Sequence, residues 1–257
     1  MSNLIYEKNI FVQYPYGAGG WFLSSLLHYA MYPREPLKFN ALGSGHSNSN
    51  ADQTNNFHKD ILYTPEFNLI INDTGFDQFS YDDRIKFLQN NIKGIQERHV
   101  FAFHAKNINI FLDAFPNSKC IQINIEDYEI KHCLANFLYK LVNDTNSIES
   151  LATHYNQNVE IAKLNLQNLL NSKEAIDYFD WASPVIQSTR NEAENELRYD
   201  NRILELMFND YMKSNIEHLL RSLLNFAEIT YDTTLFNTLT NNITTYRQGQ
   251  PTFNIDS

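Results

Sequence analysis

Residues 9–31 read NIFVQYPYGAGGWFLSSLLHYAM. The run from Asn9 to Pro15 is mostly apolar and ends at a proline, which is typical of a buried strand. A turn follows at Gly17-Ala18-Gly19-Gly20, and apolar residues then recur at helical spacing from Trp21 to Met31. Strand, glycine turn and helix in this order predict the corner of an α/β domain at which an anion or a nucleotide binds.

The glycine turn suits an anion for two physical reasons. Without Cβ atoms, glycines let backbone N–H groups approach a ligand closely, and the following helix adds unpaired amides and the positive end of its dipole. The turn is not a Walker A pattern, because no Gly-Lys-Ser/Thr ends it. It also lacks the third glycine of the dinucleotide fingerprint, since Phe22 stands there. A tight turn with close helix–strand packing and no ligand is the alternative interpretation.

Beyond this corner, short apolar runs alternate with amphipathic ones. Strands are expected at residues 67–71, 99–104 and 119–125, and helices at 85–95, 108–115, 130–141 and 151–170. Residues 201–226 are expected to form one long helix, and residues 228–231 a late strand. This alternation predicts an α/β protein with three layers, a mostly parallel sheet and a helical C-terminal half. With no internal repeat or proline-rich linker, we expect a single domain over residues 1–257.

Composition narrows the classes of function. Hydrophobic residues make up 43% of the chain and charged residues 19%, as in globular proteins. The net charge of −10 disfavours a nucleic-acid partner, and no basic run suggests a membrane surface. Cys120 and Cys133 offer no disulfide framework, and His46 and His58 lie too far apart for a common metal-ligand pattern, so no metal is expected. With no signal peptide visible, we expect a cytoplasmic protein.

Residues 13–23 resemble the opening motif of the sulfotransferase family, roughly T-Y-P-K-S-G-T-T-W-L. In that family the motif holds the 5′-phosphosulfate of 3′-phosphoadenosine 5′-phosphosulfate (PAPS). Residues 100–104 resemble the family's strand that ends in histidine, and residues 115–121 resemble its "fP-n-a-K-i-I" strand entry. Order and spacing agree over about residues 9–142. The resemblance implies a sulfotransferase-like fold of the P-loop type.

The resemblance also assigns candidate site residues. Those implied to bind PAPS at the turn are Tyr16, Gly17, Ala18, Gly19, Gly20 and Trp21. Arg247 and Gly249 belong to a Tyr-Arg-Gln-Gly segment that resembles the family's F-R-K-G segment at the 3′-phosphate of the nucleotide. His104 matches the catalytic histidine, whose usual pKa of about 6.5 suits a general base. Lys106, two residues later, is a candidate positive charge near the transferred group, and we expect the acceptor to be a small molecule or a glycan.

Three positions depart from the family pattern. Tyr16 stands where the family has the lysine that contacts the phosphosulfate. Ile125 stands where it has the arginine that binds the 3′-phosphate, and Cys133 where it has the partner serine of that arginine. We expect Cys133 to face the core. Two functions therefore remain open: a PAPS-dependent sulfotransferase, or a catalytically degenerate sulfotransferase-like nucleotide-binding or interaction module. A P-loop kinase is disfavoured because the turn lacks the Lys-Ser/Thr pair.

Two further features complete the expectations. Glu126 and Asp127, which follow the strand expected at 119–125, are candidate acids or bases. The simpler interpretation is that Asp127 caps the next helix, because acidic residues suit a helix N-terminus. The sequence leaves the oligomeric state open.

Overall fold

The computed structural model describes residues 8–14, 18–33, 80–92, 100–103, 108–126, 129, 133, 148–149, 158–171 and 200–249. In this part of the chain four parallel strands form one sheet in the order β2-β1-β3-β4. The strands are β1 (Ile10–Gln13), β2 (Val100–Phe103), β3 (Lys119–Asn124) and β4 (Ile203–Met207). The predicted α/β class and parallel sheet are therefore confirmed, and β1 lies inside the sheet.

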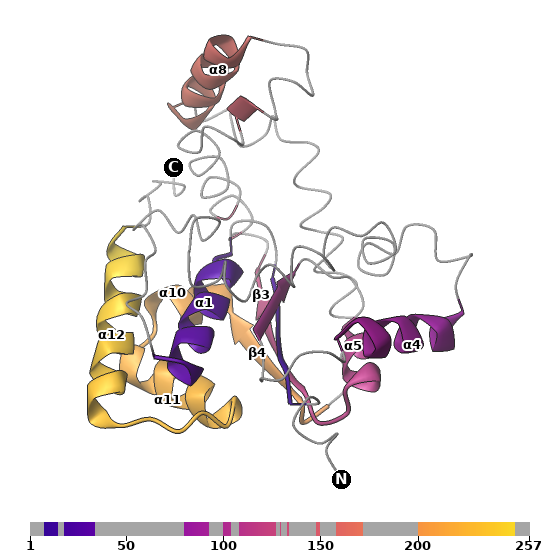
Figure 1. Ribbon diagram of the computed structural model, residues 1–257. Helices are drawn as coiled ribbons and strands as arrows, with labels where there is room; N and C mark the ends of the chain where they lie inside the picture. Colours follow the sequence, from indigo (N-terminus) through magenta and orange to yellow (C-terminus); the bar gives the residue numbers. More distant parts are fainter. Residues whose placement is uncertain are drawn as a thin grey trace.

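Helices cover both faces of this sheet (Figure 1). The helices of the described residues are α1 (Gly20–Met31), α4 (Tyr81–Ile92), α5 (Asn109–Ala114), α8 (Val159–Asn171), α10 (Phe208–Lys213), α11 (Ile216–Phe226) and α12 (Thr233–Gln248), of which α8 lies away from the sheet (Figure 1). The strand expected at 67–71 lies outside the described residues, as does most of the helix expected at 130–141, although residues 129 and 133 are helical. Within the described ranges no helix is long and apolar enough to cross a membrane.

Alternating side chains divide the core into two clusters, because successive residues of a strand point to opposite faces. On one face, Ile10 and Val12 of β1 pack with α1, α10, α11 and α12. On the other face, Phe11 of β1 and Cys120 of β3 pack with α4 and α5. Both faces are thus buried, as is usual for a parallel sheet.

The long helix expected at 201–226 is wrong. The structure instead forms β4 at Ile203–Met207, then α10, and then α11, which begins after Asn215. Five consecutive residues, four of them apolar, fit a buried strand as well as a helix, and the edge of β3 provides a partner: Ile121 pairs with Leu204. The side chain of Asn215 accepts a hydrogen bond from the His218 backbone and so starts a new helix.

The late strand expected at 228–231 is also wrong, because α11 ends there in a Schellman motif. The amide of Ile229 donates to the carbonyl of Leu224, and the amide of Glu228 donates to that of Asn225. Glu228 adopts a left-handed φ of 53°, and Lys119 holds its carboxylate at 2.7 Å. These bonds terminate the helix and lead the chain into α12.

Candidate anion-binding site

The amino end of α1 lies directly beyond β1, at the carboxyl edge of the sheet, where ligands bind in open α/β folds. The N-cap is Gly19, in the left-handed conformation with φ 77° and ψ 17°, and in the described structure no side chain caps this helix end. The first helical hydrogen bond runs from the Leu23 amide to the Gly19 carbonyl at 3.1 Å. This geometry leaves the positive end of the helix dipole at the turn, as an anion site requires.

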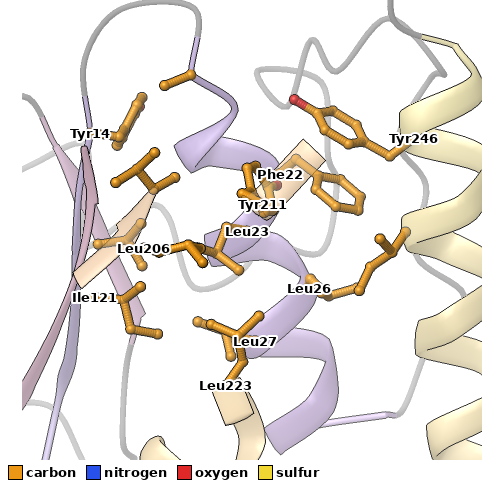
Figure 2. Packing of buried hydrophobic residues seen from close by; sticks show 14 of the residues in the cluster. Tyr14, Phe22, Leu23, Leu26, Leu27, Ile121, Leu206, Tyr211, Leu223 and Tyr246 are labelled. Carbon is orange, nitrogen blue, oxygen red and sulfur yellow. The ribbon is translucent and has the colours of Figure 1, made fainter. Parts of the chain in front are cut away.

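Aromatic side chains from the C-terminal helices close one side of this turn (Figure 2). Tyr211 of α10 donates its hydroxyl to the Gly19 carbonyl at 3.4 Å. The ring of Tyr246 on α12 stacks on Phe22 of α1, with ring centroids 3.8 Å apart and an interplanar angle of 3°. Burial raises the pKa of both tyrosines, so their hydroxyls stay protonated and neutral.

Gly19 and Gly20 are both needed for close packing at the turn. A Cβ added to Gly19 would overlap the hydroxyl of Tyr246, and one added to Gly20 would overlap the ring of Tyr14. Ala18, which precedes them, is fully buried. The structure therefore shows the close helix–strand packing of the alternative interpretation, at a helix end that no described side chain caps.

The predicted site residues are only partly described. Gly19, Gly20 and Ala18 lie at the turn, and Trp21 lies in the first turn of α1, with its side chain outside the described part. The C-cap of α12 is Gly249, whose amide donates to the Thr245 and Arg247 carbonyls. The structure brings the two predicted segments together, because Tyr246, next to Arg247, contacts the glycine turn. Tyr16, Gly17, His104 and Lys106 lie outside the described residues.

Arg247 binds backbone carbonyls of α10. Its Nε and Nη2 atoms donate to the Tyr211 carbonyl at 3.0 and 2.5 Å, and its Nη1 atom donates to the Ser214 carbonyl at 2.6 Å. These carbonyls belong to the end of α10, where acceptors lack partners within the helix. The guanidinium thus joins α12 to the end of α10 by hydrogen bonds. The role of Arg247 at the 3′-phosphate stays a prediction.

We expect Arg247→Ala to lower the free energy of unfolding by about 2 kcal/mol, because charge-assisted hydrogen bonds are lost and carbonyls are left without their donor. Arg247→Lys should recover little of this, since lysine cannot make the planar, forked contact. Urea unfolding of the three proteins measures the effect. Equal stability of all three would show that the guanidinium does not hold α10 in solution.

The two positions that correspond to the family's 3′-phosphate ligands lie in the hydrophobic core. Ile125 is 2% exposed and Cys133 is fully buried, both in the cluster beneath α1 and α12. The expectation that Cys133 faces the core is confirmed. Ile125 can donate no hydrogen bond and Cys133 is at best a weak donor, so these two side chains do not fit a 3′-phosphate.

A buried carboxylate follows β3. Glu129 is 4% exposed, its Oε2 atom accepts from the Glu126 amide at 2.7 Å, and its own amide donates to the Glu126 carbonyl at 2.8 Å. The Glu129 side chain thus binds the amide three residues before it, as the acidic residue of a capping box does, while the second bond goes to the Glu126 backbone carbonyl and not to a side chain. Asp127, the cap expected from sequence, lies outside the described residues. Burial raises the pKa of Glu129, while the nearby Asn209 amide and Lys213 oppose the shift.

Glu129→Gln should therefore raise stability at neutral pH. Below the usual glutamate pKa of 4.5 the carboxyl is protonated in the folded and unfolded chain alike. As pH rises above that value the unfolded chain releases its proton first, so wild-type stability falls until the raised pKa of the folded state is passed. Urea unfolding across pH measures the difference between the two proteins. A difference that stays constant with pH would contradict the raised pKa.

Known proteins that are similar to this chain are found among solved structures. No protein-family model matches the chain, and no curated protein sequence matches it significantly. Among solved structures, a sulfotransferase domain from the curacin biosynthetic pathway is similar, with 15% sequence identity and a TM-score of 0.37. The alignment covers 89% of this chain and 76% of that domain. Because identity and TM-score are both low, this similarity by itself assigns neither family nor function.

Proposed function

We propose that this chain is a sulfotransferase-like enzyme that binds PAPS at the amino end of α1 and transfers its sulfuryl group to a hydroxyl or an amine. One observation carries the proposal: an interior strand of a parallel sheet leads through a left-handed glycine into a helix that no described side chain caps. The backbone amides of this turn suit the 5′-phosphosulfate. The sequence motif around Gly19 supplies the choice of PAPS over other anions.

His104 is the proposed general base. It directly follows β2, whose last residue, Phe103, is the register partner of Gln13 at the end of β1. The chain therefore leaves β2 at the same edge of the sheet as the turn. His104→Ala should abolish sulfuryl transfer and leave nucleotide binding intact, and unchanged turnover would remove His104 from the mechanism.

A second function is favoured by a specific observation. Ile125 and Cys133 lie in the core, and Arg247 donates to the carbonyls of Tyr211 and Ser214, so the side chains at these three positions are engaged in packing or in bonds within the protein. A degenerate module that keeps the fold as a nucleotide-binding or interaction domain explains this loss. An enzyme that holds its donor mainly through the 5′-phosphosulfate explains it equally.

Calorimetric titration with adenosine 3′,5′-bisphosphate tests whether the chain binds the nucleotide at all, with adenosine 5′-monophosphate as the matched ligand that lacks the 3′-phosphate. The enzyme predicts bisphosphate binding in the micromolar range, about −8 kcal/mol. Equal affinity for the two nucleotides would show that the 3′-phosphate is not recognised. Absence of binding for both would overturn the proposed enzyme and leave the interaction module.

A further inference from the structure

In the described part of the chain, the Gly19 carbonyl accepts one hydrogen bond from its own helix and one from another element. The Leu23 amide donates to it at 3.1 Å, as the first bond of α1, and the Tyr211 hydroxyl of α10 donates to it at 3.4 Å. The second bond is longer than a typical O–H···O hydrogen bond of about 2.8 Å, so it adds little stability by itself. Because Leu23 already binds the carbonyl, Tyr211 is not needed to satisfy a buried acceptor.

The same peptide group belongs to the proposed anion site. In a trans peptide the C=O and N–H bonds point in opposite directions. The Gly19 carbonyl is directed into α1, so the Gly20 N–H is directed out of the amino end of the helix, where the first amides have no acceptor within the helix. An anion bound to this N–H makes the Gly19 oxygen a stronger acceptor, because linked hydrogen bonds polarise one another. The Tyr211 hydroxyl therefore contributes more when an anion is bound.

Two neighbouring elements hold Tyr211 in this position. α10 follows β4 without a loop, since Phe208 succeeds Met207. On the other side, Nε and Nη2 of Arg247 on α12 donate to the Tyr211 carbonyl. The tyrosine is 1% exposed, and its ring lies 3.2 Å from the place that a Cβ on Gly19 would occupy. The backbone of Tyr211 is thus fixed from α12 while its side chain lies against the turn.

We propose that Tyr211 is a positioning residue of the anion site and that Arg247 acts on this site through it. The Arg247 guanidinium holds the Tyr211 backbone, and the Tyr211 hydroxyl binds the Gly19 carbonyl. The peptide between Gly19 and Gly20 then presents its N–H to the anion. This inference rests on the proposed function, and it gives Arg247 a role at the 5′-phosphosulfate. Tyr211 needs no contact with the ligand, so its burial agrees with the role.

Nuclear magnetic resonance can observe this peptide group by itself. Gly19 and Gly20 are the only consecutive glycines in the sequence. In protein labelled with glycine that carries carbon-13 at the carbonyl and nitrogen-15 at the amide, Gly20 is therefore the one residue whose labelled amide is coupled to a labelled carbonyl, that of Gly19. Titration of the full chain with sodium sulfate at constant ionic strength should shift the Gly20 amide signal, and the titration curve gives the sulfate affinity.

Tyr211→Phe removes the hydroxyl and keeps the buried ring. We expect the Gly19 carbonyl signal to shift before sulfate is added, and the sulfate affinity to fall by at least about threefold. The melting temperature should stay close to that of wild type, because the Leu23 amide still binds the carbonyl. Tyr231→Phe is the matched control, since the Tyr231 ring stacks on Phe236 at 5.4 Å, away from the turn. It should leave the sulfate affinity unchanged.

Arg247→Ala separates the proposed role of the arginine from direct contact with a 3′-phosphate. Each variant is titrated well below its melting temperature. We expect Arg247→Ala to weaken the binding of sulfate, adenosine 5′-monophosphate and adenosine 3′,5′-bisphosphate by similar factors, because all three use the turn. It should add little to the effect of Tyr211→Phe in the double variant, since both act through one bond. A loss confined to the bisphosphate would place Arg247 on the 3′-phosphate and overturn its role through Tyr211.

Equal sulfate affinity of wild type and Tyr211→Phe, or no response of the Gly20 amide to sulfate, would overturn the inference. The parallel titration with adenosine 3′,5′-bisphosphate keeps the two proposals apart. Bisphosphate binding that Tyr211→Phe leaves unchanged overturns the positioning role alone. A sulfate response that depends on Tyr211, without bisphosphate binding, supports the positioning role and overturns the proposed donor.

Discussion

Gly19→Ala should destabilise the protein by about 3 kcal/mol or more. Alanine in the left-handed region costs about 1–2 kcal/mol. Gly19 has φ 77°, and a Cβ there would also overlap the Tyr246 hydroxyl and crowd the Tyr211 ring at 3.2 Å. Overpacking of this kind adds about 1–3 kcal/mol. Urea unfolding measures the total, and loss of cooperativity would indicate an even larger effect.

A double-mutant cycle separates the cost of the left-handed backbone at residue 19 from the cost of the overlap with Tyr246. Tyr246→Phe removes the hydroxyl that the new Cβ would overlap and keeps the ring on Phe22, so Gly19→Ala should cost about 1 kcal/mol less in that background than in wild type. Gly249→Ala is the control, because Gly249 has φ −82°, a conformation that alanine adopts without strain. A cost below about 1 kcal/mol for Gly19→Ala would show that Gly19 is not left-handed in solution.

The local sequence correctly predicted those helices and strands whose spacing of apolar residues fits only one type of secondary structure. The strand before the glycine turn, α1, and β3 after Pro116 were all predicted within a few residues. The error at 201–226 arose because the apolar residues of Ile203–Met207 fit helical and strand spacing alike. Only the edge of β3, distant in sequence, decides between them. The error at 228–231 arose because Glu228 supplies a left-handed helix end that is usually made by glycine.

In the candidate site, too, local structure could be predicted from the sequence, whereas contacts between elements distant in sequence could not. The glycine turn before α1 could be predicted, since it is a local motif, whereas the binding role of the segment around Arg247 stays a prediction. The contact between the two through Tyr246 could not be predicted, nor could the hydrogen bond from Tyr211 to the turn, because both depend on how α10 and α12 pack on α1.

The largest effect is expected at Ile125, the position at which the sulfotransferase motif has its phosphate-binding arginine. Ile125 is 2% exposed and packs in the cluster that also holds Cys133 and Tyr246. Ile125→Arg would place an unpaired charge in this core, and uncompensated buried charges typically cost about 3–5 kcal/mol. We therefore expect the variant to unfold at much lower urea concentration or to be recovered unfolded. Ile125→Met, which preserves volume and polarity, should cost less than about 1.5 kcal/mol.

The same variant tests how the proposed donor site relates to that motif. One outcome is that Ile125→Arg, alone or combined with Cys133→Ser, folds with nearly wild-type stability and binds adenosine 3′,5′-bisphosphate more tightly than adenosine 5′-monophosphate. Residue 125 would then reach the ligand, and its side chain could lie outside the core as well as within it. The other outcome is that Ile125→Arg unfolds the protein while Ile125→Met is tolerated. The core would then require an apolar side chain at the position where the motif has the arginine that binds the 3′-phosphate. A donor would then be held by the turn at Gly19 without the arginine and serine of the motif, and nucleotide selectivity would rest on contacts other than these two.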